Sequence, residues 1–166
     1  MRELLEAARE AIRARLLGRP PRPPPFTLAP AAVFVTLRKD GELRGCMGTL
    51  EPRSKDLVRE TMERAVVAAF EDPRFPPLTA GELPHCTIEV TVLGPLETGE
   101  LDPARYGIEV RAGDRRAVLL PGIPGIATAE EQVAAARRKA GIPDGAPVTV
   151  KRFSAVKVEE EGPGEP

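Results

Sequence analysis

The sequence is poor in the residues that most often carry catalysis, metal binding and base stacking. Its 166 residues include no tryptophan, one tyrosine, one histidine and two cysteines. So few aromatic side chains give little surface on which nucleic-acid bases can stack. The net charge of −1, from 24 basic and 25 acidic side chains, also lacks the basic excess of a typical nucleic-acid-binding domain. We therefore expect that nucleic acid is not the partner.

Long apolar runs are missing as well. No stretch approaches the roughly 20 apolar residues that cross a bilayer, and no apolar signal segment with a small-residue cleavage site is present. Cys46 and Cys86 are too few to form a disulfide framework. We expect no membrane association and a reducing, cytoplasmic environment.

The shortage of soft ligands argues against a metal centre. His85 and Cys86 are neighbours, so on a strand their side chains point to opposite faces. Even with Cys46, the chain offers three such ligands, one fewer than a closed zinc site needs. We predict no metal and no cofactor, and any acid–base scheme that needs a histidine must use His85.

The residues that are present predict an α+β fold with a mostly antiparallel sheet and flanking helices. Hydrophobic residues make up 42% and charged residues 30%, as in a compact domain. Apolar periodicity and capping patterns predict helices at 2–17, from an N-cap at Ser54 to about 70, and at 128–140. Alternating or β-branched runs predict strands at 33–39, 42–50, 86–92, 108–110, 116–120 and 148–158. The acidic stretch 159–166 is expected to fray.

The most informative stretch is Leu43–Leu50, which follows the turn Asp40-Gly41 and holds Cys46. A two-residue Asp-Gly hairpin loop places Lys39 opposite Glu42, Arg44 opposite Leu37, and Cys46 opposite Val35. On a regular strand Arg44 and Cys46 share a face, so a cation could tune the thiol. Cys46 is therefore either a catalytic nucleophile or a packed, ligand-lining side chain, and both interpretations stay open.

Two further pairs in the sequence have a structural and a functional interpretation. Gly45 and Gly48 either let a ligand approach the backbone or permit a bulge or close packing. Asp72 and Arg74, in a proline-rich loop, either lock that loop with an ion pair or form a wall that orients a ligand. Together with Arg44 and Thr49, these residues form our candidate ligand-binding set.

The segment Leu43-Arg44-Gly45-Cys46-Met47-Gly48-Thr49-Leu50 resembles the LRGCIGT signature of the AMMECR domain family. The segment Ala68–Leu78 is similar to a second block of the family, and Glu82-Leu83 with Ile88-Glu89-Val90 to a third. The resemblance covers nearly the whole chain. Met47 stands in the place of the family's usual isoleucine, and a Gln-Gly-Trp run common after Pro121 is absent.

The resemblance implies a two-subdomain α+β fold with the signature facing a cleft between the subdomains. We place the main subdomain at roughly 1–95 plus 128–158 and the smaller one at roughly 96–127. The resemblance brings no established activity. From Arg44, Gly45 and Gly48 themselves we expect a small anionic ligand in that cleft. Through the AmmeMemoRadiSam grouping of prokaryotic members, the resemblance implies a pathway of small-molecule or RNA modification. The alternative is a non-catalytic interaction module for a Memo-like or radical-SAM protein partner.

Overall fold

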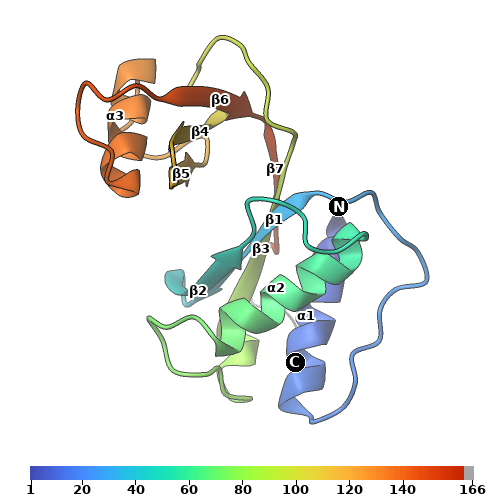
Figure 1. The fold of residues 1–166 in the computed structure, drawn as a ribbon. Helices are drawn as coiled ribbons and strands as arrows, with labels where there is room; N and C mark the ends of the chain where they lie inside the picture. Colours follow the sequence, from blue (N-terminus) through green and yellow to red (C-terminus); the bar gives the residue numbers. More distant parts are fainter. Residues whose placement is uncertain (163–166) are drawn as a thin grey trace. The chain divides into compact units, whose positions relative to one another are not determined.

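The computed structural model describes residues 1–162 and divides into two compact units. One unit comprises Met1–Val92 and the chain from Lys157 onward, and the other comprises Leu93–Val156. Each unit has its own antiparallel sheet and its own apolar core, so the fold is of the predicted α+β class (Figure 1).

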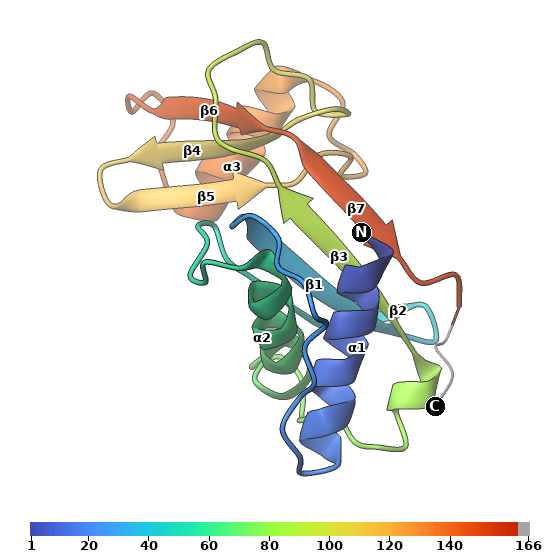
Figure 2. The same cartoon turned by 90° about the vertical axis from the view of Figure 1, so that its right-hand side faces the viewer.

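The first unit is a four-stranded sheet covered on one face by two helices (Figures 1 and 2). Its strand order is β2-β1-β3-β7. The elements are α1 (Arg2–Leu16), β1 (Ala32–Lys39), β2 (Glu42–Gly48), α2 (Leu57–Phe70), the short 3-10 helix η1 (Leu83–His85), β3 (Cys86–Leu93) and β7 (Ala155–Glu159). The apolar sides of both helices and the alternate residues of β1 and β3 form one core, which includes Leu4, Ile12, Val35, Leu37, Ile88 and Val90.

The helix α2 begins two residues later than the sequence suggests. Its N-cap is Asp56, whose side chain accepts a hydrogen bond from the backbone N–H of Val58. The predicted cap, Ser54, instead accepts a hydrogen bond from the backbone N–H of Asp56. A carboxylate at the cap also complements the positive end of the helix dipole, which is why Asp56 is the better cap.

The second unit is a three-stranded sheet with one helix on it. The strands β4 (Gly107–Ala112), β5 (Arg115–Leu119) and β6 (Thr149–Phe153) have the order β5-β4-β6, and α3 (Ala129–Ala140) packs on β4 and β5. The Thr128 side chain caps α3, as the predicted helix start at 128 requires, and Gly141 ends it in the left-handed conformation. The core includes Ile108, Val110, Ala117, Leu119, Ala136 and Ile142.

This division differs from the one expected from the sequence, where 128–158 was assigned to the main subdomain. The helix α3 packs on β4 and β5, and β6 pairs with β4, so both belong to the second unit. The predicted single strand 148–158 is two strands in different sheets, interrupted at Ser154. No glycine or proline marks that break in the sequence.

The expectation of a frayed end is wrong for Glu159 and Glu160. Glu159 is the last residue of β7, and the backbone N–H of Glu160 donates to the carbonyl of Ile88 on β3. The Glu160 carboxylate binds Arg9 of α1 through two hydrogen bonds of 2.7 and 2.6 Å. The remainder of the predicted tail, residues 163–166, lies outside the described residues.

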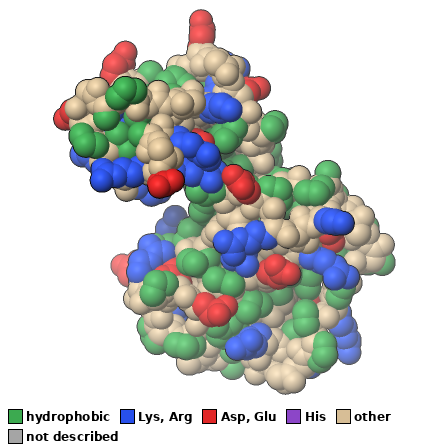
Figure 3. Space-filling view, viewed as in Figure 1, with side chains coloured by type: hydrophobic (Ala, Val, Ile, Leu, Met, Phe, Trp, Pro, Cys, Tyr) green, Lys and Arg blue, Asp and Glu red, His purple; other side chains and the backbone are tan. Residues whose placement is uncertain are grey.

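Charged side chains of both signs are interspersed on the face shown in Figure 3, consistent with the net charge of −1. Within residues 1–162, no helix is both long and apolar enough to cross a membrane.

Candidate functional site

A β-bulge lies in the middle of the signature. Lys39 pairs with Glu42 as predicted, but the register shifts so that Leu37 pairs with Gly45 and Thr36 with Cys46. The predicted partners of Arg44 and Cys46, Leu37 and Val35, are therefore wrong. Arg44 is the extra residue of the bulge, because Arg38 pairs with Leu43 and Leu37 already with Gly45.

The bulge directs Arg44 to the loop that follows α2. Its Nε and Nη2 atoms lie 3.0 and 3.2 Å from the two carboxylate oxygens of Glu82, and Nη2 also donates to the carbonyl of Pro76 at 2.8 Å. The Phe75 ring lies 5.7 Å from the guanidinium carbon. Arg44 is only 7% exposed, yet its Nη1 has no hydrogen-bond partner among the described residues. A buried donor in this state costs about 1–3 kcal/mol.

Glu82 is the counter-charge that holds Arg44. The hydrogen bond from Arg44, the backbone N–H of Thr79 and the ammonium of Lys39 at 3.2 Å lower the pKa of Glu82 to about 2. The carboxylate is therefore ionised at neutral pH. It fixes the plane of the Arg44 guanidinium, as outer carboxylates fix functional side chains in other sites.

Cys46 has different neighbours from Arg44. Thr36 Oγ1 lies 3.2 Å from Cys46 Sγ across the hairpin. The backbone N–H of Cys46 donates to Asp72 Oδ2 at 3.0 Å, and Arg74 Nη2 donates to its carbonyl at 3.4 Å. The cation that contacts Cys46 is thus Arg74, at the backbone carbonyl, and tuning of the thiol by Arg44 stays a prediction.

Asp72 and Arg74 form the loop-locking ion pair that was one of their two interpretations. Their closest approach is 2.7 Å, and Asp72 is 3% exposed. The hydrogen bond from Arg74, helped by those from the backbone of Cys46 and Arg74, holds the pKa of Asp72 far below its usual range. Because β2 is an edge strand, this pair also occupies backbone groups that would otherwise be open to another strand.

The two signature glycines are in close contact with other parts of the chain. A Cβ atom at Gly45 would overlap the carbonyl oxygen of Ala68 on α2, and one at Gly48 would overlap the ring of Phe34. Close packing therefore accounts for glycine at both positions, and ligand approach there stays a prediction.

Thr49 ends the signature against a buried carboxylate. Thr49 Oγ1 lies 3.4 Å from Glu60 Oε1, and Glu60 also accepts hydrogen bonds from the backbone N–H groups of Arg53 and Ser54. Glu60 is fully buried, and Arg64, one turn later on α2, lies 3.9 Å from it. The helix face that carries Glu60, Arg64 and Ala68 therefore runs beneath the signature.

The remaining chemistry-bearing residues, His85 and Cys86, differ in exposure. His85 is exposed, with Nδ1 4.0 Å from Asp40 Oδ1. Cys86 is fully buried, as its core interpretation predicted, and burial raises the pKa of its thiol. Among residues 1–162, no group of three histidine, cysteine, aspartate or glutamate side chains could hold a metal ion.

Sequence reasoning missed Glu82 and Phe75 as members of this site. Arg44 and Arg74 both lie beside the Phe75 ring, at 5.7 and 5.6 Å from its centre. Both residues fall in segments that resemble family blocks, but neither charge pattern nor spacing pairs Glu82 with an arginine 38 positions earlier. Three cavities, of about 530, 470 and 200 Å³, are lined by other residues.

Comparison with known proteins shows the family. Residues 5–158 match the AMMECR1 family. A protein of Methanothermobacter thermautotrophicus is 39% identical over 185 residues, covering 97% of this chain and 94% of that protein. A protein of Thermotoga maritima is 48% identical over 119 residues, covering 69% of this chain and 68% of that protein. The crystal structure of the uncharacterized protein PH0010 from Pyrococcus horikoshii has a TM-score of 0.82 and 35% identity, covering 96% and 91% of the two chains.

The chain therefore belongs to the AMMECR1 family. Some relatives are longer: the match to a Clostridium acetobutylicum protein, at 37% identity, spans 28% of that protein. The α+β fold is that of PH0010.

Proposed function

We propose that the signature region binds a small anion, with Arg44 Nη1 as the principal donor. The observation that carries this proposal is the buried Nη1, which has no partner among residues 1–162 while Nε and Nη2 of the same guanidinium are paired. A guanidinium fixed on one edge by a carboxylate keeps its other N–H groups oriented for a ligand.

The charge balance around Arg44 also favours an anion. Arg44, Arg74 and Lys39 contribute three positive charges, and Glu82 and Asp72 contribute two negative ones. The low pKa values of both acids keep them ionised at neutral pH. The local excess of one positive charge suits a carboxylate or a phosphate, whose oxygens accept charge-assisted hydrogen bonds.

In this proposal Cys46 lies beside the anion site and does not bind the anion. Its role as a nucleophile stays a prediction. Its Sγ is placed by Thr36, and its backbone is held on both sides by Asp72 and Arg74. A role for the ligand in small-molecule or RNA modification stays a prediction from the resemblance. A Memo-like or radical-SAM protein partner stays a prediction as well.

The test follows the arginine side-chain NMR signals while inorganic phosphate, pyrophosphate, acetate or citrate is added at constant ionic strength. We expect at least one of these anions to shift the Nη1 signals of Arg44 in a saturable manner. The signals of Arg38, an exposed arginine on the same hairpin, serve as the control for non-specific ion effects.

Two variants separate binding from folding. Arg44→Lys keeps a positive charge near Glu82 but removes the second guanidinium edge, so it should lose saturable binding while retaining a cooperative thermal transition. Arg38→Gln should bind as the unmodified protein does. If none of the four anions moves the Arg44 signals more than those of Arg38, the proposal is wrong.

A further inference from the structure

Among residues 1–162, three of the four sheet edges have outward backbone groups that are hydrogen-bonded by other parts of the chain. The β2 edge is bonded by Asp72 and Arg74 at Cys46. On β6, Arg152 exchanges two backbone hydrogen bonds with Glu97. On β5, the carbonyl of Val118 accepts a hydrogen bond from Lys139. Proteins commonly close edges in this way, because an open edge is a template for another strand.

The fourth edge, that of β7, is open over Lys157–Glu159. The backbone N–H of Glu160 donates to the carbonyl of Ile88, and the carbonyl of Ser154 accepts from the N–H of Gly94. The even-numbered residues of β7 therefore direct their backbone N–H and C=O groups toward β3. In an antiparallel pair the intervening residues direct their N–H and C=O groups to the other side. Within residues 1–162, no hydrogen bond reaches the outward groups of Lys157 or Glu159. The Lys157 side chain is 56% exposed.

We propose that this edge pairs with β7 of a second copy of the chain, antiparallel about a two-fold axis at Val158. This pairing joins two four-stranded sheets into one of eight strands. It rests on the β7 edge alone and is independent of anion binding at the signature.

The charges of β7 select this register. An axis at Val158 places Lys157 opposite Glu159 of the partner subunit, and Glu159 opposite the partner's Lys157. Axes at Lys157 or at Glu159 instead oppose two lysines or two glutamates. Opposite charges in direct cross-strand pairs stabilise a sheet and like charges destabilise it, by about 0.2–1 kcal/mol each. The outward direction of both residues matches the hydrogen-bonded pairs that this register needs.

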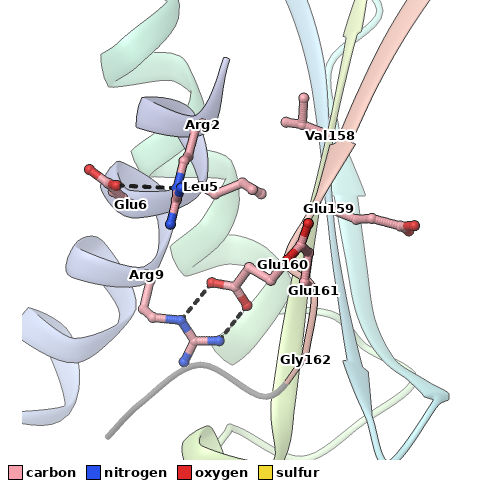
Figure 4. A pocket seen from close by; sticks show the side chains of 9 residues that line it. All are labelled: Arg2, Leu5, Glu6, Arg9, Val158, Glu159, Glu160, Glu161 and Gly162. Atoms are coloured by element: carbon pink, nitrogen blue, oxygen red, sulfur yellow. Dashed lines mark hydrogen bonds and ion pairs between the residues drawn. The ribbon is translucent and has the colours of Figure 1, made fainter.

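A cavity borders the face of β7 that carries Val158. This cavity, of about 530 Å³, lies between the first turns of α1 and the end of β7 (Figure 4). Leu5 and Val158 supply its apolar lining, and the Arg9–Glu160 ion pair closes one side of it. The two Val158 side chains meet at the axis, beside this cavity in each copy. Burial of these apolar side chains adds to the backbone hydrogen bonds of the new strand pair.

The first test is a charge exchange, read by sedimentation equilibrium of the full chain up to about 1 mM, since a five-residue strand pair buries less than a standard interface. The Lys157→Glu change places a glutamate opposite Glu159 of the partner subunit, and symmetry repeats this pair once. The Glu159→Lys change likewise places two lysines opposite each other in both pairs. We expect each change alone to weaken association about tenfold, and the double variant to restore it.

Controls separate this effect from folding. Lys157 also lies 3.6 Å from Glu89, so thermal unfolding is measured for every variant. Charge reversal at the exposed Lys55, by Lys55→Glu, should leave association unchanged. A protein that stays monomeric at 1 mM, or a dimer that the exchange leaves unchanged or fails to restore, overturns the proposal.

The second test reads the axis directly. Residues on the axis of a non-hydrogen-bonded pair have Cα atoms about 4.5 Å apart, within reach of a disulfide. Mild oxidation should therefore cross-link the Val158→Cys variant into a dimer. The Val156→Cys variant places its thiol opposite Glu160 of the partner subunit and should not cross-link. Equal cross-linking of both variants would show that the register is wrong.

Discussion

Gly45 on β2 lies directly against the backbone carbonyl of Ala68 on α2, with no space for a side chain between them. This contact sets how closely the helix approaches the signature strand. The other signature glycine, Gly48, is covered by the ring of Phe34, which is a side chain and can rotate. The two glycines therefore differ in what surrounds them.

We predict that Gly45→Ala destabilises the protein by 3 kcal/mol or more, roughly the upper end for overpacked cores, because a backbone atom of a packed helix must move. Gly48→Ala should cost about 1 kcal/mol, since only the Phe34 ring has to shift. Urea unfolding of both variants measures the difference. Equal losses of stability would contradict this account of the packing.

The second prediction concerns how the free energy of unfolding changes at acidic pH. The pKa of Glu82 falls from 4.5 to about 2 through its hydrogen bonds with Arg44, Thr79 and Lys39. A carboxyl group with a depressed folded-state pKa stabilises the protein fully above its unfolded pKa. This stabilisation is lost as the pH falls from about 4.5 towards 2, and its size is about 3 kcal/mol.

Glu82→Gln should therefore be less stable than the unmodified protein at pH 6, and the gap should narrow steadily between pH 4.5 and pH 2. Urea unfolding at pH 6, 4 and 3 provides the measurement. Glu42→Gln, at an exposed position of the same hairpin, should leave the pH profile unchanged. A gap that stays constant across this range would mean that the pKa of Glu82 is the same in the folded and the unfolded protein.

The third prediction uses the two cysteines. Cys46 is partly exposed on an edge strand, whereas Cys86 is fully buried and burial raises the pKa of its thiol. An aromatic disulfide reagent should therefore label one thiol in the folded protein and two in urea. Cys46→Ala should remove the native reaction, and Cys86→Ala should leave it intact. Slow, equal labelling of both thiols in the folded protein would exclude a reactive Cys46.

The sequence predicted the elements well where a local signal determines them. The Asp40-Gly41 turn, the Thr128 cap and the apolar stripe of α2 all depend on neighbouring residues, and the structure confirms them. Resemblance of the signature also led to the family that the comparisons show. The β-bulge at Arg44 could not be predicted, because it results from packing against the loop that carries Glu82.

The break at Ser154 and the buried pairing of Glu160 escaped prediction for the same reason. An acidic run at the end of a chain is usually solvated, and only the fold brings Arg9 of α1 to Glu160, 151 residues away. Long-range ion pairs of this kind leave no pattern in one sequence. The division into units was misjudged because β6 and β7 read as one strand.

The last prediction tests that ion pair. Arg9 binds the Glu160 carboxylate at 2.7 and 2.6 Å and also donates to the carbonyl of Cys86, while Glu160 Oε2 accepts from the backbone N–H of Ile88. The pair thus hydrogen-bonds the backbone at the start of β3, where β7 no longer pairs with it. Removal of either partner leaves a largely buried charge and unpaired backbone groups.

We expect Arg9→Met and Glu160→Gln each to destabilise the protein by about 3 kcal/mol. The double variant should cost much less than the sum, because neither buried charge is then left alone. Amide hydrogen exchange at Ile88 should quicken in the Glu160 variant, since its acceptor is altered. Glu161→Gln, at the exposed neighbouring position, provides the matched control and should change neither quantity. Additive losses in the double variant would show that the two side chains stabilise the fold independently.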